Sequence, residues 1–258
     1  MHDLPELLQT KWLGRVHEHH AELGSTNDRA LAWVKEGAGA GALVTADCQH
    51  EGRGRLGRTW SSPLGDIYAS VVVQPAVPAE RVGALALVTA LALHDGITEM
   101  CPTLKDRVRI KWPNDMLIAR RKVAGILCET KYQGSRMDAV IGFGLNVART
   151  TFPASLANSA TSLALELAST TPVPTRARVL ACVLEHLERE LECFDRDGFS
   201  GARARYLAVA LLGESRSVPD GRGGRVDVLV DTVAEDGALE GVTRSGQRIR
   251  VRSADIES

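Results

Sequence analysis

The chain has 258 residues, of which 44% are hydrophobic and 24% charged, and its formal net charge is −1 at pH 7. This apolar content is sufficient for one large folded domain with a small appendage, and it argues against a disordered protein. A net charge so close to zero excludes a global basic field that would draw the protein to nucleic acid or membranes, so any anion binding must be local.

The amino-terminal residues MHDLPELLQT contain neither the basic region nor the apolar region of a signal peptide. The longest nearly apolar run, at 84–93, has about half the length that a membrane span needs. The five cysteines are odd in number and form no C-x-x-C pair, which favours free thiols in a reducing compartment. We therefore expect a cytoplasmic protein.

The first predicted helix covers 25–37. Ser25 and Asp28 have the spacing of a capping box, and Gly37 is placed to end the helix. Just before it, the letters HEHH at 17–20 offer histidines to a metal, but their spacing suits the edge of a strand and no further ligands are evident. We expect a strand there and no metal site.

Two strands and a long helix are predicted next. The strands cover 41–49 and 66–75, and a loop rich in glycine and arginine separates them. The run at 80–100 is apolar on nearly every side, which predicts a buried helix.

A series of strands with short connections follows. At 107–112 the residues alternate, with Val108, Ile110 and Trp112 on one side and charged residues on the other. Pro113 ends this strand and the next two residues, Asn-Asp, favour a turn. Further strands are expected within the segments 116–119, 122–132 and 138–147.

The last third of the chain changes character twice. From 159 the pattern is helical, and its apolar stripe consists of Val179, Val183, Leu187 and Leu191. After 212 short β segments alternate with turns, among them 235–237 and 244–246. The sequence thus predicts a mixed α/β domain at 1–211 and a small C-terminal β domain at 212–258, which is too small to fold well alone and should pack on the first.

The loop between the first two long strands contains the pattern G-x-G-x-x-G at 52–57. A dinucleotide-binding turn has this pattern, but it must open a helix and be followed about 20 residues later by an acidic residue, and this stretch meets neither condition. A disordered nucleic-acid-binding segment would be repeated and rich in aromatic residues. Two interpretations remain, a solvated surface turn and a loop whose glycine backbone and arginine side chains clamp anionic groups.

Three further segments favour the anion clamp. The segment KWPND at 111–115 places an amide and a carboxylate on a tight turn, although plain turn formation explains them equally well. Lys122 begins a strand that contains Gly125. The segment GFGLNV at 142–147 has two glycines inside a strand, which is typical of a close approach by a ligand.

Taken together, these segments resemble the biotin protein ligases. The resemblance rests on five blocks in the family's order, which are Ser25-Thr26-Asn27, Gln49 with the glycine-arginine segment from Gly52 to Trp60, Lys111 to Asp115, Lys122 to Leu127, and Gly142-x-Gly144-x-Asn146. Each block alone is of weak or moderate specificity, whereas all five in order are very specific. They span 25–147, with weaker similarity through the end of the chain.

The resemblance implies a fold and a two-step reaction. The fold would be a mixed-sheet catalytic domain followed by an SH3-like β-barrel. In the first step, the carboxylate of biotin attacks the α-phosphate of ATP, which yields biotinyl-5′-AMP and pyrophosphate. In the second, a lysine of a biotin carboxyl carrier protein or domain attacks this mixed anhydride and releases AMP. ATP and biotin are then substrates, Mg²⁺ accompanies the nucleotide, and the protein is a monomer or a weak homodimer.

The resemblance also assigns residues to these ligands. Lys122 and Arg55 would be catalytic, holding the carboxylate and the α-phosphate, and Asp115 would bind the metal. The residues assigned to biotin are Ser25, Thr26, Asn27, Gln49, Gly52, Arg53, Gly54, Arg55, Lys122, Gly125, Gly142 and Gly144. The residues assigned to the nucleotide are Arg55, Arg58, Trp60, Asn114, Asp115, Lys122 and Asn146.

Two departures from the family pattern have consequences. Only about 24 residues precede Ser25, so we expect no N-terminal DNA-binding domain and no specific DNA binding. The segment 148–160 matches an adenylate-covering loop in position but has no tryptophan, which puts aromatic stacking on adenine from this loop in doubt. The alternatives are a lipoate or octanoyl ligase of related fold and a non-catalytic sensor of biotin or adenylate, and the presence of both Arg55 and Lys122 argues against the sensor.

Overall fold

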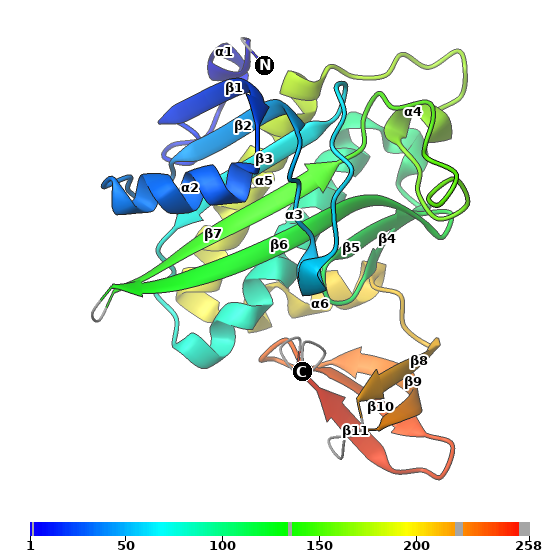
Figure 1. Ribbon diagram of the computed structural model, residues 1–258. Helices are drawn as coiled ribbons and strands as arrows, with labels where there is room; N and C mark the ends of the chain where they lie inside the picture. Colours follow the sequence, from blue (N-terminus) through cyan, green and yellow to red (C-terminus); the bar gives the residue numbers. More distant parts are fainter. Residues whose placement is uncertain (2, 134–135, 220–223, 253–258) are drawn as a thin grey trace.

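The computed structural model describes residues 1, 3–133, 136–219 and 224–252, and it shows a mixed sheet with helices on both faces and a second, smaller sheet (Figure 1). The helices are α1 (Leu4–Leu7), α2 (Thr26–Lys35), α3 (Leu85–Met100), α4 (Leu163–Glu166), α5 (Arg176–Asp197) and α6 (Ser200–Val209). Short 3₁₀ turns are η1 (Arg55–Gly57), η2 (Ala79–Ala84) and η3 (Pro102–Leu104).

The larger sheet has seven strands in the order β1-β2-β3-β7-β6-β5-β4. Its strands are β1 (His17–Leu23), β2 (Leu43–Gln49), β3 (Ile67–Val73), β4 (Val108–Lys111), β5 (Asp115–Ile118), β6 (Arg121–Gln133) and β7 (Arg136–Leu145). Only the β1–β2 pair is parallel, and the other neighbours are antiparallel. Every strand predicted in this part of the chain is therefore present, and the segment 17–20 lies in the edge strand β1.

Both faces of this sheet are covered, which explains why β3 is buried along its whole length. On one face α3 packs on the strands and α5 packs on α3, and all four residues of the predicted α5 stripe are at most 4% exposed. On the other face α2 packs on β2, β3 and β7, where Ala30 and Val34 meet Val44, Val72 and Val140. Because side chains alternate along a strand, Gly142 and Gly144 lie on this same face of β7, and Asn146 follows the strand. Asn27 of α2 covers Gly142, whereas Trp60 and not α2 covers Gly144.

The long apolar helix predicted at 80–100 appears as η2 followed by α3. By length and composition alone, the stretch Glu80–Met100 could cross a membrane. In the folded chain 78% of its most apolar window is buried inside the protein, as expected of a core helix. All five cysteines are free thiols, as predicted.

One local prediction was wrong. Helix α2 begins after Ser25, but the Ser25 side chain makes no capping hydrogen bond and no capping box forms. The Asp28 carboxylate instead pairs with the Arg53 guanidinium at 2.7 Å, since a cation from the glycine-arginine loop is a stronger partner than a backbone N–H group. The predicted helix stop holds, because Gly37 adopts a left-handed conformation with φ of +103° directly after the cap residue.

The second sheet is antiparallel, with the order β11-β10-β9-β8, and lies beneath the larger one in Figure 1. Its strands are β8 (Ser215–Pro219), β9 (Arg225–Val233), β10 (Leu239–Thr243) and β11 (Arg248–Val251). Both predicted hairpin turns are present, with Gly237 and Gly246 at φ of +85° and +83°. The apolar side chains of this sheet join the core of the larger domain. The predicted boundary at 211/212 falls between α6 and β8, and the last six residues lie outside the described part of the chain.

Candidate functional site

A cavity of about 540 Å³ lies on the α2 face of the large sheet, between the start of α2, the loop after β2 and strands β5, β6 and β7. Ser25 and Gln49 line one end of the cavity, and Asn114, Asp115 and Lys122 line another. These segments are far apart in the sequence, and the antiparallel pairing of the central strands brings them to one place. The volume suits a ligand of the size of a small cofactor.

Two paired glycines form part of the cavity wall. Gly125 on β6 and Gly144 on β7 are direct partners in the sheet, and the ring of Trp60 lies over both of them. A Cβ atom at Gly144 would be 2.3 Å from the Trp60 indole nitrogen, and a Cβ atom at Gly125 would be 3.1 Å from its ring. The glycines that were predicted to allow a ligand to come close are therefore in contact with the Trp60 indole. The buried indole N–H has no hydrogen-bond partner in the described chain.

At the α2 end of the cavity, a chain of hydrogen bonds holds the polar side chains in place. The Thr26 backbone N–H and hydroxyl both donate to the Gln49 amide oxygen, at 2.8 and 3.1 Å. The Gln49 amide nitrogen donates to the Ser62 hydroxyl at 2.9 Å, and the Ser70 hydroxyl donates to the Thr26 hydroxyl oxygen at 2.8 Å. All of these groups are partly or fully buried, so they are held rigidly and present fixed donors and acceptors to a ligand.

Asn27 forms the cavity wall next to these hydrogen-bonded side chains. Its amide oxygen accepts from Ser70, and its amide nitrogen donates to Glu129 at 2.7 Å. The side chain lies so close to β7 that a Cβ atom at Gly142 would be 1.8 Å from the Asn27 amide oxygen. Gly142 is thus required by Asn27 itself, and not only by an incoming ligand.

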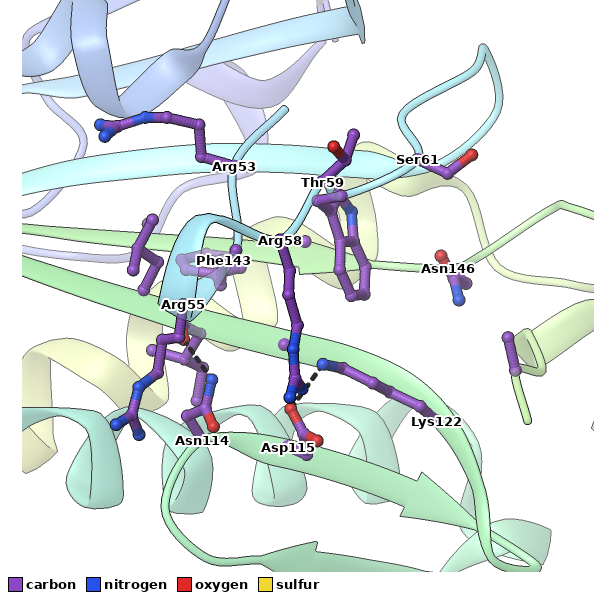
Figure 2. Close-up of a pocket in the computed structure, with 18 of the residues that line it drawn as sticks. Arg53, Arg55, Arg58, Thr59, Ser61, Asn114, Asp115, Lys122, Phe143 and Asn146 are labelled. Carbon is purple, nitrogen blue, oxygen red and sulfur yellow. Dashed lines mark hydrogen bonds and ion pairs between the residues drawn. The ribbon is translucent and has the colours of Figure 1, made fainter. Parts of the chain in front are cut away.

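The glycine-arginine loop is fastened to the rest of the site at two places. The Arg53 guanidinium lies 2.7 Å from Asp28 on α2 and 2.7 Å from Glu129 on β6. At the tip of the loop, Leu56 adopts a left-handed conformation with φ of +59°, which is uncommon for a residue other than glycine. Figure 2 shows that Arg53 points away from the Asp115–Lys122 end of the cavity.

The opposite end of the cavity is charged. The Lys122 ammonium lies 2.5 Å from the Asp115 carboxylate and 5.1 Å from the centre of the Trp60 ring. Figure 2 shows Arg58 extending from the loop toward this pair, whereas Arg55 lies on the Asn114 side and points away from Lys122. The sequence predicted that Arg55 and Lys122 converge, and in this structure Arg58 is the arginine that extends toward Lys122.

Asn114 ends the turn between β4 and β5, where the Trp112–Pro113 peptide bond is cis, and Asp115 begins β5. The Asn114 amide nitrogen donates to the Ile126 carbonyl at 2.8 Å, and the Asn114 carbonyl accepts from the Ile126 N–H at 2.9 Å. These two bonds tie the turn to β6 and give the Asp115 carboxylate a defined position beside Lys122.

The segment 148–160 borders the cavity and is anchored by a buried carboxylate. Asp66, which is fully buried, accepts from the Val147 N–H at 2.8 Å and lies 3.5 Å from the Arg149 guanidinium. Burial raises the pKa of Asp66, and the nearby Arg149 opposes this rise. The Arg149 guanidinium lies 4.8 Å from the centre of the Phe152 ring, so this segment does supply an aromatic side chain to the cavity although it has no tryptophan.

The structure gathers almost every residue that the sequence assigned to a ligand. Those that line this one cavity are Ser25, Thr26, Asn27, Gln49, Arg53, Gly54, Arg55, Arg58, Trp60, Asn114, Asp115, Lys122, Gly125, Gly142, Gly144 and Asn146. Gly52 does not line it, because its backbone packs against the other leg of the loop, where a Cβ atom would be 2.4 Å from the Trp60 carbonyl oxygen.

Sequence reasoning missed four residues that build the site. Ser70 and Glu129 hold Asn27, and Arg149 and Phe152 border the cavity from the segment after β7. Ser70 had a weak signal, since it is a polar residue in a strand that is otherwise apolar. Glu129 had none, because its partners Asn27 and Arg53 are distant in the chain.

The oxygen donors at the charged end suit a magnesium ion. Asp115 supplies a carboxylate, and the buried Asn146 amide oxygen has no hydrogen-bond partner in the described chain. Magnesium prefers such oxygen ligands and commonly shares them with substrate phosphates. Elsewhere, Glu99, Cys182 and His186 lie close enough to share an ion, and two of them, His186 and Glu99, form an ion pair at 2.9 Å.

Comparison with known proteins agrees with this geometry. The sequence pattern of the biotin/lipoate A/B protein ligase family matches residues 22–146. The chain is 33% identical to the bifunctional ligase/repressor BirA of Bacillus subtilis, over 97% of this chain and 76% of that protein. It is also 33% identical to the biotin–[acetyl-CoA-carboxylase] ligase of Paracoccus denitrificans, over 89% of this chain and 91% of that protein.

Solved structures give the same result. The biotin protein ligase of Aquifex aeolicus in complex with biotin and ATP superposes with a TM-score of 0.79 and 26% identity, and the match covers 93% of this chain and 97% of that one.

Proposed function

This chain belongs to the biotin/lipoate A/B protein ligase family, as one of its biotin protein ligases, and on that premise we propose that it activates biotin as biotinyl-5′-AMP and transfers the biotinyl group to a lysine of a biotin carboxyl carrier protein or domain. The observation that carries the proposal is a cavity that has fixed polar side chains at one end. At its other end it is lined by Lys122, whose side chain is partly exposed. Biotin has the matching chemistry, a polar ureido ring joined to a chain that ends in a carboxylate.

In this proposal the ureido ring occupies the α2 end of the cavity. The Ser25 hydroxyl makes no capping bond and faces the cavity, and the Thr26 and Gln49 side chains are already oriented by each other. Pre-oriented groups lose little conformational freedom when a ligand binds, which favours affinity and selectivity. The carboxylate then points toward Lys122.

The first reaction joins two anionic groups that repel each other. A carboxylate oxygen of biotin attacks the α-phosphorus of ATP, the bond from this phosphorus to the bridging oxygen breaks, and pyrophosphate leaves with the electron pair. Lys122 and Arg58 supply the positive charge that the reacting oxygens need, and Arg55 lines the same cavity on the Asn114 side. Nucleotidyl transfer depends mainly on such positioning and charge neutralisation. Asp115 would hold Mg²⁺, which would offset the charge of the triphosphate, and the Asn146 amide oxygen lines the same cavity.

The second reaction uses the stored energy of the mixed anhydride. The neutral amine of a carrier lysine attacks the biotinyl carbonyl carbon, the bond from this carbon to the phosphate oxygen breaks, and AMP leaves as the amine loses a proton. Until the carrier arrives, the anhydride must be protected from water. The loop at 50–60 and the segment 148–160 border the cavity and provide this cover.

The deciding experiment measures pyrophosphate release from MgATP with biotin, lipoate or octanoate as the acid. We expect release that depends on biotin, followed by transfer of biotin to an isolated carrier domain, detected as a streptavidin-binding band that is lost when the acceptor lysine is changed to arginine. Release that depends on lipoate or octanoate but not on biotin would assign the chain to the other branch of the family. Binding of biotin without pyrophosphate release would indicate a sensor.

A further inference from the structure

The second sheet touches the charged end of the site through the backbone that leads into it. After α6, the Leu211 N–H donates to the Ile110 carbonyl at 2.8 Å, so the connecting segment runs alongside β4. Glu214 then pairs with Arg120, a cavity-lining residue in the turn between β5 and β6, at 2.9 Å. The connecting segment therefore packs against strand β4, which leads to Asp115, and against the β5–β6 turn, which precedes Lys122.

Arg216, on β8, makes the most direct of these contacts. Its guanidinium donates from Nη1 to the Trp112 carbonyl oxygen at 2.9 Å, at the start of the turn that carries Asn114 and Asp115. Its other terminal nitrogen, Nη2, is buried and has no hydrogen-bond partner in the described part of the chain. Arg216 as a whole is half-buried, and a buried nitrogen without a hydrogen-bond partner lowers stability.

The same turn is held from the second sheet at another atom. The Trp112 indole N–H donates to the Gly237 carbonyl at 2.9 Å, in the turn between β9 and β10. Asn114 is held from the other side by its two hydrogen bonds to Ile126. The turn is thus clamped between β6 of the large sheet and the second sheet.

Arg216 does not line the cavity, so it acts through the turn rather than on a ligand. Burial lowers the pKa of the Arg216 guanidinium, and the nearby Glu214 carboxylate opposes this. An arginine remains protonated under such conditions, so a fixed positive charge lies at the Trp112 carbonyl, at the start of this turn.

From these contacts we propose that Arg216 is a positioning residue for the nucleotide. It fixes the Trp112 carbonyl and with it the turn that presents Asn114 and Asp115, so the second sheet forms part of the nucleotide end of the site. The inference rests on the proposed function, because it takes Asn114 and Asp115 to face ATP and Mg²⁺. It predicts that ATP use, and not biotin use, depends on Arg216.

The test compares Arg216→Met and Arg216→Lys with Arg248→Met. Arg248 lies in the same sheet and makes an exposed ion pair with Asp231, so this control reports a general disturbance of the sheet. Pyrophosphate release gives KM for ATP, KM for biotin and the Mg²⁺ dependence of each folded protein. Removing a residue that orients a metal or phosphate ligand commonly costs about tenfold or more in affinity.

We expect Arg216→Met to raise KM for ATP about tenfold and to shift the Mg²⁺ dependence, with KM for biotin unchanged. Arg216→Lys restores one donor to the Trp112 carbonyl and should fall between Arg216→Met and the unmodified protein. Equal changes in KM for ATP and KM for biotin, or no change in either, would overturn the inference. If Arg216→Met does not fold, the same comparison of the two KM values is made with Arg216→Lys. Absence of biotin-dependent pyrophosphate release in the unmodified protein is a different result, since it would refute the proposed function itself.

Discussion

Replacing Lys122 by alanine is expected to lower the rate of adenylate formation strongly and to change the stability of the protein only slightly. The side chain is about one-third exposed, and it contacts the Asp115 carboxylate at 2.5 Å and the Trp60 ring at 5.1 Å. An ion pair this accessible contributes about 0–1 kcal/mol to stability, and a cation near an aromatic ring adds about 0.5–1 kcal/mol. Both together are small against the 5–15 kcal/mol or so that typically stabilises a domain. The variant should therefore remain folded.

The catalytic cost of the same change is larger. Loss of one charged contact to the oxygens that gain charge in the transition state costs about 3 kcal/mol, which corresponds to about a hundredfold in rate. The two magnitudes differ enough to be told apart. We expect kcat for biotin-dependent pyrophosphate release to fall about a hundredfold while the unfolding transition moves only slightly.

The assay is steady-state pyrophosphate release at saturating MgATP and biotin, paired with thermal unfolding of the same samples. Lys131→Ala is the matched control, because Lys131 lies on the same strand but outside the cavity. Near-normal release by Lys122→Ala would remove Lys122 from the mechanism. An equal loss in Lys131→Ala would show that the effect arises from strand β6 in general.

Three further predictions concern other parts of the chain. Gly144→Ala would place a Cβ atom 2.3 Å from the Trp60 indole nitrogen, so the indole ring must shift by about 1 Å. Adenylate formation should then fall about a hundredfold. Unchanged kinetics and unchanged tryptophan fluorescence would contradict this prediction. Arg55→Ala should release biotinyl-5′-AMP prematurely, and labelling of a bystander protein should exceed that seen with the unmodified enzyme; no excess, with adenylate synthesis intact, would refute the role. Burial and two neighbouring histidines lower the pKa of His17 from 6.5 to about 4. Between these pH values the unfolded chain binds a proton at His17 that the folded chain does not bind. The free energy of unfolding is therefore unaffected by His17 above pH 6.5 and decreases as the pH falls from 6.5 toward 4. Urea unfolding across this range should show a shallower decline for His17→Gln, and parallel curves for the two proteins would exclude His17 as the cause.

Much of the fold could be predicted from the spacing of apolar, glycine and proline residues along the sequence. The alternation at 107–112 predicts strand β4 with Val108 and Ile110 inside, and both are fully buried. The stripe in α5 and the glycine turns at 237 and 246 are also present where predicted. These features depend on neighbouring residues, whose spacing alone decides which face of an element is apolar and where the backbone can turn.

The site was predictable where its residues form compact blocks. The blocks that contain Thr26, Gln49 and Lys122 predicted a shared ligand site, and their side chains line one cavity. The predicted capping box failed for the opposite reason, because Asp28 found a partner, Arg53, that no local pattern could indicate. Local spacing shows which bond a side chain can form nearby, but not which distant group competes for it.

The sequence by itself determined the order and type of most elements, the family, and the set of residues that meet at the cavity. Only the tertiary structure decided how those residues are held. Asn27 reaches Glu129 across 102 positions of sequence, and Arg216 reaches Trp112 across 104. The physical reason is that a hydrogen bond depends on ångström-scale placement of two groups, and for groups this far apart in the chain that placement exists only after the sheet has paired and the helices have packed on it.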